Sequence, residues 1–283
     1  MQDLNAFKEN IVDNINNILS NTLHGDSLRN YQYEKSEFIG TNTEFDDLCG
    51  GIQTKQITVI AGASGDGKSL TCLNLALAIS NSNLSKNILY FSIENLPETD
   101  LGRISSSQFG ITDNFNYYNI DWLKCKKYDS IVITLKFLIQ NGGYDVVFID
   151  GLQNILPNND DGMSSYNIGN ELMSDLNDIV KNDTKSALVL TWQLTRGTKS
   201  KKLSEITIDD ISTSMGVTRY ASHVYLVKYE PKDEVKNIPA TRKLARIKCR
   251  TECNPDKWWI YLAQQQTGIK FTLNPKIIDP IYK

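Results

Sequence analysis

The residues best suited to chemistry form one short run, residues 62–69, which read GASGDGKS. Two glycines, a lysine and a serine match the pattern G-x-x-x-x-G-K-S, in which backbone N–H groups turn toward phosphate oxygens. Lys68 would reach the terminal phosphates, and the Ser69 hydroxyl would bind Mg²⁺. The pattern predicts a phosphate-binding loop (P-loop) for a nucleoside triphosphate. The predicted contact residues are Gly62, Ala63, Ser64, Gly65, Asp66, Gly67, Lys68, Ser69 and Leu70.

Two acidic residues follow apolar runs and complete the chemistry that such a loop needs. Asp150 closes the run 146–149, and Glu94 closes the run 88–93. Both carboxylates would emerge at the edge of the sheet where α/β proteins hold ligands. We expect Asp150 to act on the Mg²⁺ side and Glu94 to be the general base. The alternative for either acid is a cap on the next helix or turn.

The elements that must position these residues alternate along the chain. Apolar runs predict strands at 57–61, 88–93, 145–150 and 187–191, and helical patterns lie at 70–80, 131–140 and 171–181. Strands that are apolar throughout and alternate with helices indicate a mostly parallel sheet covered on both faces. Runs at 224–227, 245–248 and 258–262 predict hairpin strands that extend it. The fold class is therefore α/β.

The N-terminal segment has a different pattern. Apolar residues recur at spacings of three and four between residues 3 and 19, which predicts an amphipathic helix. We expect residues 1–36 to form this linker helix with its linker, and residues 37–283 to form the main domain. The helix could fold back on its own domain or dock on a neighbouring subunit.

Composition limits the class of protein. The 283 residues carry a net charge of −3, which argues against a protein that coats nucleic acid but leaves room for a local basic channel. No stretch is long and apolar enough to span a membrane, and the first residues lack the order of a signal peptide. A cytoplasmic protein without a membrane partner is the expectation.

Four segments together resemble a known family. They read GGIQTKQITVIAGASGDGKSLTCLNLALAIS, ILYFSIEN, VVFIDGLQNI and LVLTWQLTR. In this order and spacing the chain is similar, from about residue 39 to about residue 262, to the motor domain of DnaB-type hexameric replicative helicases. The resemblance implies a RecA-like P-loop NTPase core, ATP and Mg²⁺ as cofactors, and a homo-oligomeric ring of six subunits. A primase or a helicase loader would be a further partner.

The resemblance also implies roles for single residues. Glu94 matches the catalytic glutamate of the family, and Asp150 matches its Walker B acid. Gln193 matches the glutamine that senses the γ-phosphate. Lys248 and Arg250, in ARIKCR, match the lysine and the arginine finger that reach the nucleotide of the neighbouring subunit.

The residues of the chain also suggest that another subunit supplies a cation to the phosphates. We expect no arginine close to the P-loop, so charge that develops on the phosphoryl oxygens would need a cation from another subunit. The alternative for Arg250 is a solvated arginine on a β-hairpin.

A basic cluster follows the predicted strand at 187–191. Lysines on a loop suit contact with phosphates whatever the base sequence, and in the resembling family this loop faces single-stranded DNA. The alternative is a solvated cluster of charges. The cluster consists of Arg196, Lys199, Lys201 and Lys202.

Three functions remain open on this basis. The first is an ATP-dependent DNA helicase that moves along single-stranded DNA as a ring. The second is a RecA-like recombination or annealing ATPase that forms filaments. The third is a nucleotide-binding regulatory module that does not translocate, which the departures from the family near His223 and after Arg250 keep open.

Overall fold

A computed structural model describes residues 36–124, 126–156, 165–183, 185–211, 215–231, 240–250, 259–265 and 268–272. The helix predicted within residues 3–19 therefore lies outside the described residues. From Ser36 onward the chain forms one compact unit.

Nine strands of the described chain form one sheet, in the order β11-β10-β9-β8-β3-β7-β6-β4-β5. The six strands from β8 to β5 run parallel, and β9, β10 and β11 add an antiparallel extension. Two short strands, β1 and β2, pair separately. The strands are β1 (Phe38–Ile39), β2 (Ile52–Gln53), β3 (Ile57–Gly62), β4 (Ile88–Ser92), β5 (Phe115–Asn119), β6 (Val146–Asp150), β7 (Ala187–Gln193), β8 (His223–Glu230), β9 (Thr241–Cys249), β10 (Trp259–Gln265) and β11 (Gly268–Thr272).

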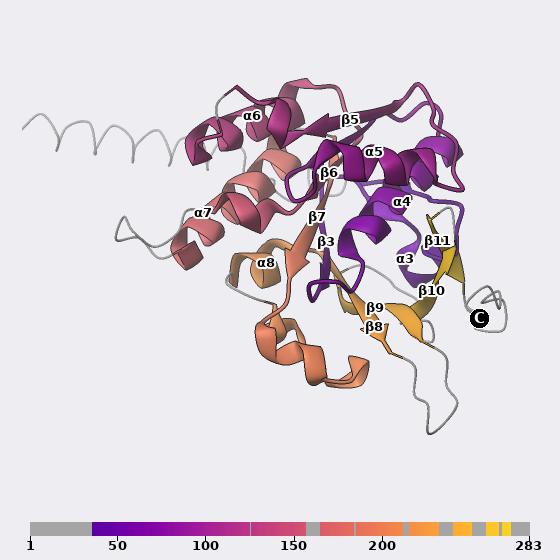
Figure 1. Ribbon diagram of the computed structural model, residues 1–283. Helices are drawn as coiled ribbons and strands as arrows, with labels where there is room; N and C mark the ends of the chain where they lie inside the picture. Colours follow the sequence, from indigo (N-terminus) through magenta and orange to yellow (C-terminus); the bar gives the residue numbers. More distant parts are fainter. Residues whose placement is uncertain are drawn as a thin grey trace, which may run out of the picture. The chain divides into compact units, whose positions relative to one another are not determined.

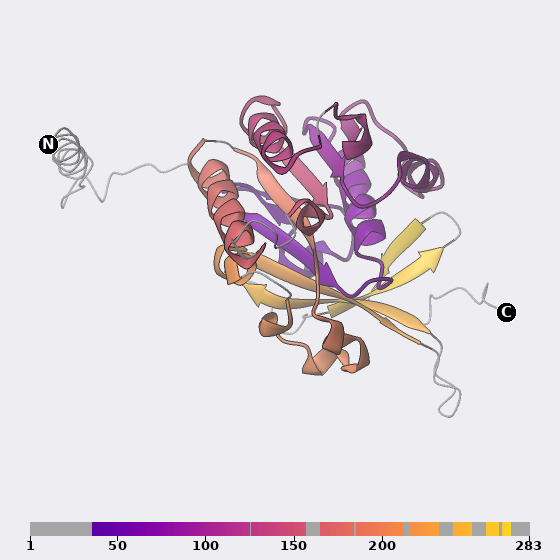
Figure 2. The same cartoon turned by 60° about the vertical axis from the view of Figure 1, so that its left-hand side comes forward.

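Helices cover both faces of this sheet (Figures 1 and 2). One face packs against α6, α7 and α8, and the other against α3, α4 and α5. The helices are α3 (Asp46–Cys49), α4 (Lys68–Ser82), α5 (Pro97–Ser105), α6 (Tyr128–Asn141), α7 (Ser165–Asp178) and α8 (Met215–Tyr220). The predicted α/β fold with a mostly parallel sheet is confirmed.

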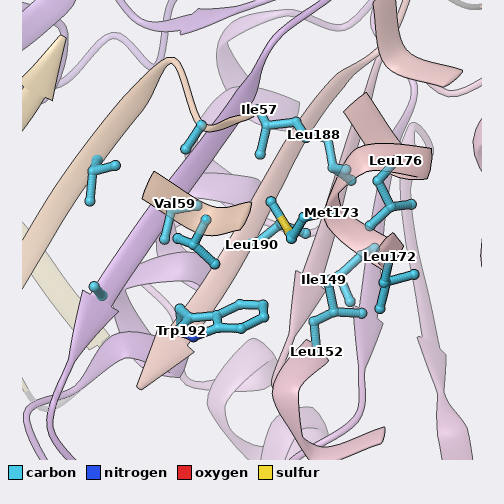
Figure 3. Packing of buried hydrophobic residues seen from close by; sticks show 14 of the residues in the cluster. Ile57, Val59, Ile149, Leu152, Leu172, Met173, Leu176, Leu188, Leu190 and Trp192 are labelled. Carbon is cyan, nitrogen blue, oxygen red and sulfur yellow. The ribbon is translucent and has the colours of Figure 1, made fainter. Parts of the chain in front are cut away.

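Burial of apolar side chains holds the layers together. Figure 3 shows Leu172, Met173 and Leu176 of α7 against side chains of the central strands, with Trp192 at the end of β7. Trp192 is fully buried. Each such side chain contributes about 1.5–3 kcal/mol when it leaves water. This packing fixes the ends of β3, β6 and β7 relative to one another.

The main differences from the predicted elements lie at the two edges of the sheet. The patterns missed α5 and β5 at one edge and β11 at the other. β5 reads FNYYN, because an edge strand is not buried on both faces and needs no continuous apolar run. The helix expected at 171–181 begins earlier, at Ser165, and ends in a π-helical turn over Ile179–Asp183. These differences leave the central strands as predicted.

In the part of the chain that the structure describes, no helix is both long enough and apolar enough to cross a membrane.

Candidate functional site

The loop over residues 62–69 joins the end of β3 to the start of α4 and forms the base of the site. Gly67 caps α4 with φ of 100°, a left-handed conformation that favours glycine. The Asp66 carboxylate is buried and accepts a hydrogen bond from the Ala63 N–H at 3.0 Å. The Lys68 side chain folds over the loop, where its Nζ donates to the Ala63 carbonyl at 3.2 Å. The loop is therefore compact, and its lysine is held at its centre.

The other predicted loop residues vary in exposure. Ser64 and Gly65 lie exposed at the tip, while Ser69 and Leu70 are half-buried in the first turn of α4. The N–H groups of this first turn face no helical partner, as at any helix N-terminus, and can bind an anion.

Asp150 lies at the end of β6 and is completely buried. Its Oδ1 accepts from Ser69 Oγ at 3.0 Å and from Thr191 Oγ1 at 2.7 Å. Its Oδ2 accepts from the Tyr90 hydroxyl and from Asn95 Nδ2, both at 3.1 Å. Four donors from four segments satisfy the carboxylate and join it to the helix that follows the loop.

Glu94 lies beside Asp150. The neighbouring strands bring Ser92 into register with Asp150, and the Ile93 N–H donates to the Asp150 carbonyl at 2.9 Å. Glu94 is exposed, but partial burial of its carboxyl group raises its pKa, and the charge of Asp150 raises it further. The nearby charges of Lys68 and Arg103 lower the pKa in part. A carboxylate with a raised pKa is a better proton acceptor.

Gly151 explains how Glu94 fits there. Gly151 has φ of 89°, and a Cβ atom at this position would lie 2.8 Å from the Glu94 Cβ. Only glycine leaves room for the two strand ends to approach in this way.

Gln193 ends β7 directly beside the loop. It is in register with Gly62, and the next residue, Leu194, donates its N–H to the Gly62 carbonyl at 3.2 Å. The Gln193 N–H donates to Gln153 Oε1 at 3.0 Å, which ties β7 to the turn after Asp150. The structure thus brings the loop, Glu94, Asp150 and Gln193 to one edge of the sheet.

Lys248 and Arg250 lie elsewhere. β9 runs antiparallel to β8, so its first residues lie at the edge of the loop and Lys248 lies near the opposite edge, beside Val224. The six residue steps along β9 from Arg242 to Lys248 span roughly 20 Å. Lys248 and Arg250 donate to the carbonyls of Thr218 and Arg219, at the end of α8. Partial burial and the charge of Arg250 lower the pKa of Lys248 to about 8.

The predicted basic cluster forms ordered turns instead of an irregular loop. A 3-10 turn spans Arg196–Ser200 at the loop edge of the sheet, as Figure 1 shows after β7. Lys199 and Lys202 are exposed. Lys201 instead pairs with Asp210 at 2.6 Å, and its hydrogen bond lowers the pKa of that carboxyl group. The side chain of Arg196 lies outside what the structure describes.

The expectation that no arginine lies close to the loop is wrong. The Arg242 side chain lies against Gly67, with its Nε 3.3 Å from the point that a Cβ of Gly67 would occupy. Arg242 follows Gly67 by 175 positions in the sequence (242 minus 67), so its proximity depends on the pairing of β8 with β9. No local pattern could predict it.

A second buried acid also escaped the sequence analysis. Asp100, on α5, is completely buried and accepts from Ser92 Oγ at 2.5 Å and from the Tyr117 hydroxyl at 3.3 Å. Arg103 pairs with it at 3.3 Å. Burial raises the pKa of Asp100. The charge of Asp100 also raises the pKa of Glu94.

The donor set fits Mg²⁺ bound together with a nucleotide. Ser69 and Asp150 offer adjacent oxygen atoms, which Mg²⁺ prefers, and it commonly takes one or two protein ligands plus phosphate oxygens and water. Within the described ranges, no group of three or more His, Cys, Asp or Glu side chains could hold a metal ion by itself. The nucleotide would have to supply further ligands.

Comparison with models of known protein families gives no match, and a search of curated proteins gives none.

Proposed function

We propose that this chain is a Mg²⁺-dependent ATP hydrolase whose nucleotide binds at residues 62–69, on a RecA-like P-loop core. One observation carries the proposal. Ser69 Oγ and Asp150 Oδ1 are 3.0 Å apart although 81 positions separate the two residues in the chain. A loop serine beside a strand-end acid is the pair that holds Mg²⁺ against nucleotide phosphates in P-loop NTPases.

Each residue of the site has a place in this proposal. The N–H groups of the loop and Lys68 bind the phosphates, and Ser69 and Asp150 would hold Mg²⁺, which supplies charge neutralisation when it is bound. Glu94 accepts a proton from the attacking water, and its raised pKa suits that role. Gln193 is in register with Gly62 and would contact the terminal phosphate.

Two variants test the binding part. Lys68→Ala removes a charge-assisted contact of about 1.5–3 kcal/mol, so we expect ATP binding to weaken roughly 10- to 100-fold. Asp150→Asn should bind ATP as the wild type does when Mg²⁺ is absent. Addition of Mg²⁺ should raise the ATP affinity of the wild type but not that of this variant. Lys136→Ala, on α6, removes an equal charge on a different helix and should bind as the wild type does. Unchanged ATP binding by Lys68→Ala, measured by calorimetry, would refute the proposal.

We propose further that the ATPase is a ring-forming motor, a helicase that translocates on single-stranded DNA. Lys248 and Arg250 lie near the edge of the sheet opposite the loop over residues 62–69 of the same chain. They could therefore reach only a nucleotide that is bound to another copy of the chain. The exposed Lys199 and Lys202 are available for phosphates. ATP turnover can be measured across a series of protein concentrations, with and without single-stranded DNA, while light scattering follows the mass of the assembly. Turnover should rise with assembly and should also rise when DNA is added.

The alternatives give other results in the same experiment. A RecA-like recombination ATPase would assemble on DNA into open filaments of increasing mass. A regulatory module would hydrolyse ATP, or bind it, without any response to DNA. The pairing of Lys201 with Asp210 supports this last alternative, because it withdraws one lysine from the basic cluster.

A further inference from the structure

Arg242 lies at the rim of the loop, on β9, which carries none of the residues predicted to bind the nucleotide of the same chain. Its Nε and Cδ are 3.3 and 3.4 Å from the position of a Cβ on Gly67, the residue that caps α4. Its Nε atom is shielded from solvent. A guanidinium at this place lies next to the N–H groups that begin α4.

Tyr229 holds the Arg242 side chain there, and a hydrogen bond in turn holds Tyr229 to the loop. Tyr229, its cross-strand neighbour, places its ring 5.1 Å from the Arg242 guanidinium carbon, a cation–π distance. The Tyr229 N–H donates to Asp66 Oδ1 at 3.3 Å. The buried Asp66 carboxylate therefore links the loop to the end of β8, and β8 positions Arg242.

The chemistry of the place is that of an anion site. The first turn of α4 carries unpaired N–H groups and the positive end of the helix dipole. A planar guanidinium with five N–H donors binds phosphate oxygens well, often through two parallel hydrogen bonds. Because the side chain is already partly buried and stacked, binding would cost it little further side-chain entropy.

We propose that Arg242 is a phosphate-binding residue supplied by the same chain, which contacts the diphosphate part of the nucleotide at the first turn of α4. This inference rests on the proposed nucleotide site. Arg242 and Arg250 then have different roles, because Arg242 contributes to affinity in a single subunit and Arg250 acts only between subunits.

Calorimetric titration with inorganic pyrophosphate and with ADP tests this inference, at a protein concentration where light scattering shows a monomer. Arg242→Met keeps the apolar stem and removes the charge, while Arg242→Lys keeps the charge without the planar group. The control is Lys243→Met, which removes an equal charge from the next residue of β9. Lys243 pairs with Glu230 at 2.6 Å and lies over the Trp259 ring.

We expect Arg242→Met to weaken the binding of both ligands about tenfold or more, Arg242→Lys to weaken it less, and Lys243→Met to change it less than about twofold. Equal affinities for Arg242→Met and Lys243→Met would overturn the inference. So would a loss of ADP binding alone, because the side chain would then contact the nucleoside instead of the phosphates. Circular dichroism melting of each variant shows whether the fold is kept. A wild type that binds neither pyrophosphate nor any nucleotide would instead refute the proposed function, and this inference with it.

Discussion

Asp150 receives hydrogen bonds from α4, β4, β7 and the segment after β4, so one buried carboxylate aligns four parts of the site. The Thr191 hydroxyl has a double role, since it donates to Asp150 and accepts from the Gly151 N–H at 2.7 Å. The alignment of Ser69 with Asp150 therefore depends on side chains outside the set predicted to bind a nucleotide.

Thr191→Val tests that dependence. Valine has nearly the same shape but leaves the Gly151 N–H without its acceptor and Asp150 with three donors. We expect a loss of about 1–3 kcal/mol in the free energy of unfolding, measured with urea. Ser200→Ala, which removes an exposed hydroxyl, is the control and should change stability by less than about 0.5 kcal/mol. An equally stable Thr191→Val variant would contradict the role of this hydroxyl.

The raised pKa of Glu94 sets a pH dependence. As the proposed general base, Glu94 must be ionised, so turnover should fall as pH decreases through the Glu94 pKa, which lies above its usual value. Arg103→Gln removes a charge that lowers this pKa. The acid limb of the kcat/KM profile should then move to higher pH, while Lys136→Gln leaves it in place. A shift to lower pH for Arg103→Gln would exclude Glu94 as the base.

At the residue scale, local patterns predicted that the loop, Glu94 and Asp150 lie at the same edge of the sheet. Each follows an apolar strand, and parallel strands end at the same edge. Asp100 and Arg242 could not be predicted. Asp100 lies in a helix that the patterns missed, and Arg242 approaches Gly67 only through strand pairing.

At the scale of elements, the end of β8 joins the proposed nucleotide site to the basic cluster. Tyr229 contacts Asp66 through its N–H, and the buried Lys228 beside it donates to the carbonyls of Thr198 and Lys199 at 3.3 and 2.9 Å. A shift of the loop can thus reach the turn over Arg196–Ser200 through two adjacent residues.

Lys228→Met tests this connection. Methionine fills similar space but cannot donate to the two carbonyls, so the turn should lose its anchor. We expect faster amide hydrogen exchange in residues 196–202 while exchange in β3 is unchanged. Lys199→Met, whose side chain is exposed, should leave exchange at both places as in the wild type. Unchanged exchange in Lys228→Met would show that other contacts hold the turn.

His223, at the start of β8, gives a second prediction for this part of the sheet. It is almost fully buried, and burial together with the charge of Arg246 lowers its pKa to about 4. The folded state thus binds a proton less readily than the unfolded state, and stability should decrease as pH falls from about 6.5 toward 4. Between pH 7.5 and 5 the loss would be about 2 kcal/mol. In urea unfolding, the stability of His223→Asn should decrease by about 2 kcal/mol less than that of the wild type over this pH range. An equal decrease in both proteins would refute the lowered pKa of His223.

The order of elements was predictable where strands are buried on both faces, as in β3, β6 and β7, because they read as continuous apolar runs. The edge strand β5 and the helix α5 were not, because a half-exposed strand with asparagines resembles a loop. The order of the strands in the sheet could not be predicted, because no local pattern in the sequence determines which strands pair.

At the scale of the whole molecule, the separation of Arg250 from the proposed nucleotide site has a consequence for assembly. In one chain Arg250 is exposed, and its side chain donates a hydrogen bond to the Arg219 carbonyl at the end of α8. If a second copy receives this arginine, Arg250→Ala should lower turnover at high protein concentration and leave the basal turnover of the monomer unchanged. Lys126→Ala, in an exposed pair with Asp121, is the control. Wild-type turnover of assembled Arg250→Ala would exclude the finger role.

The central claim, ATP hydrolysis at residues 62–69, is tested most directly by Glu94→Gln. Glutamine keeps the size of the side chain and cannot accept the proton, so the variant should bind ATP with the affinity of the wild type while phosphate release falls by about 100-fold or more. Both quantities can be measured on the same preparation, by calorimetry and by a phosphate assay. Wild-type rates of phosphate release from Glu94→Gln, or no ATP binding by the wild type, would contradict the account.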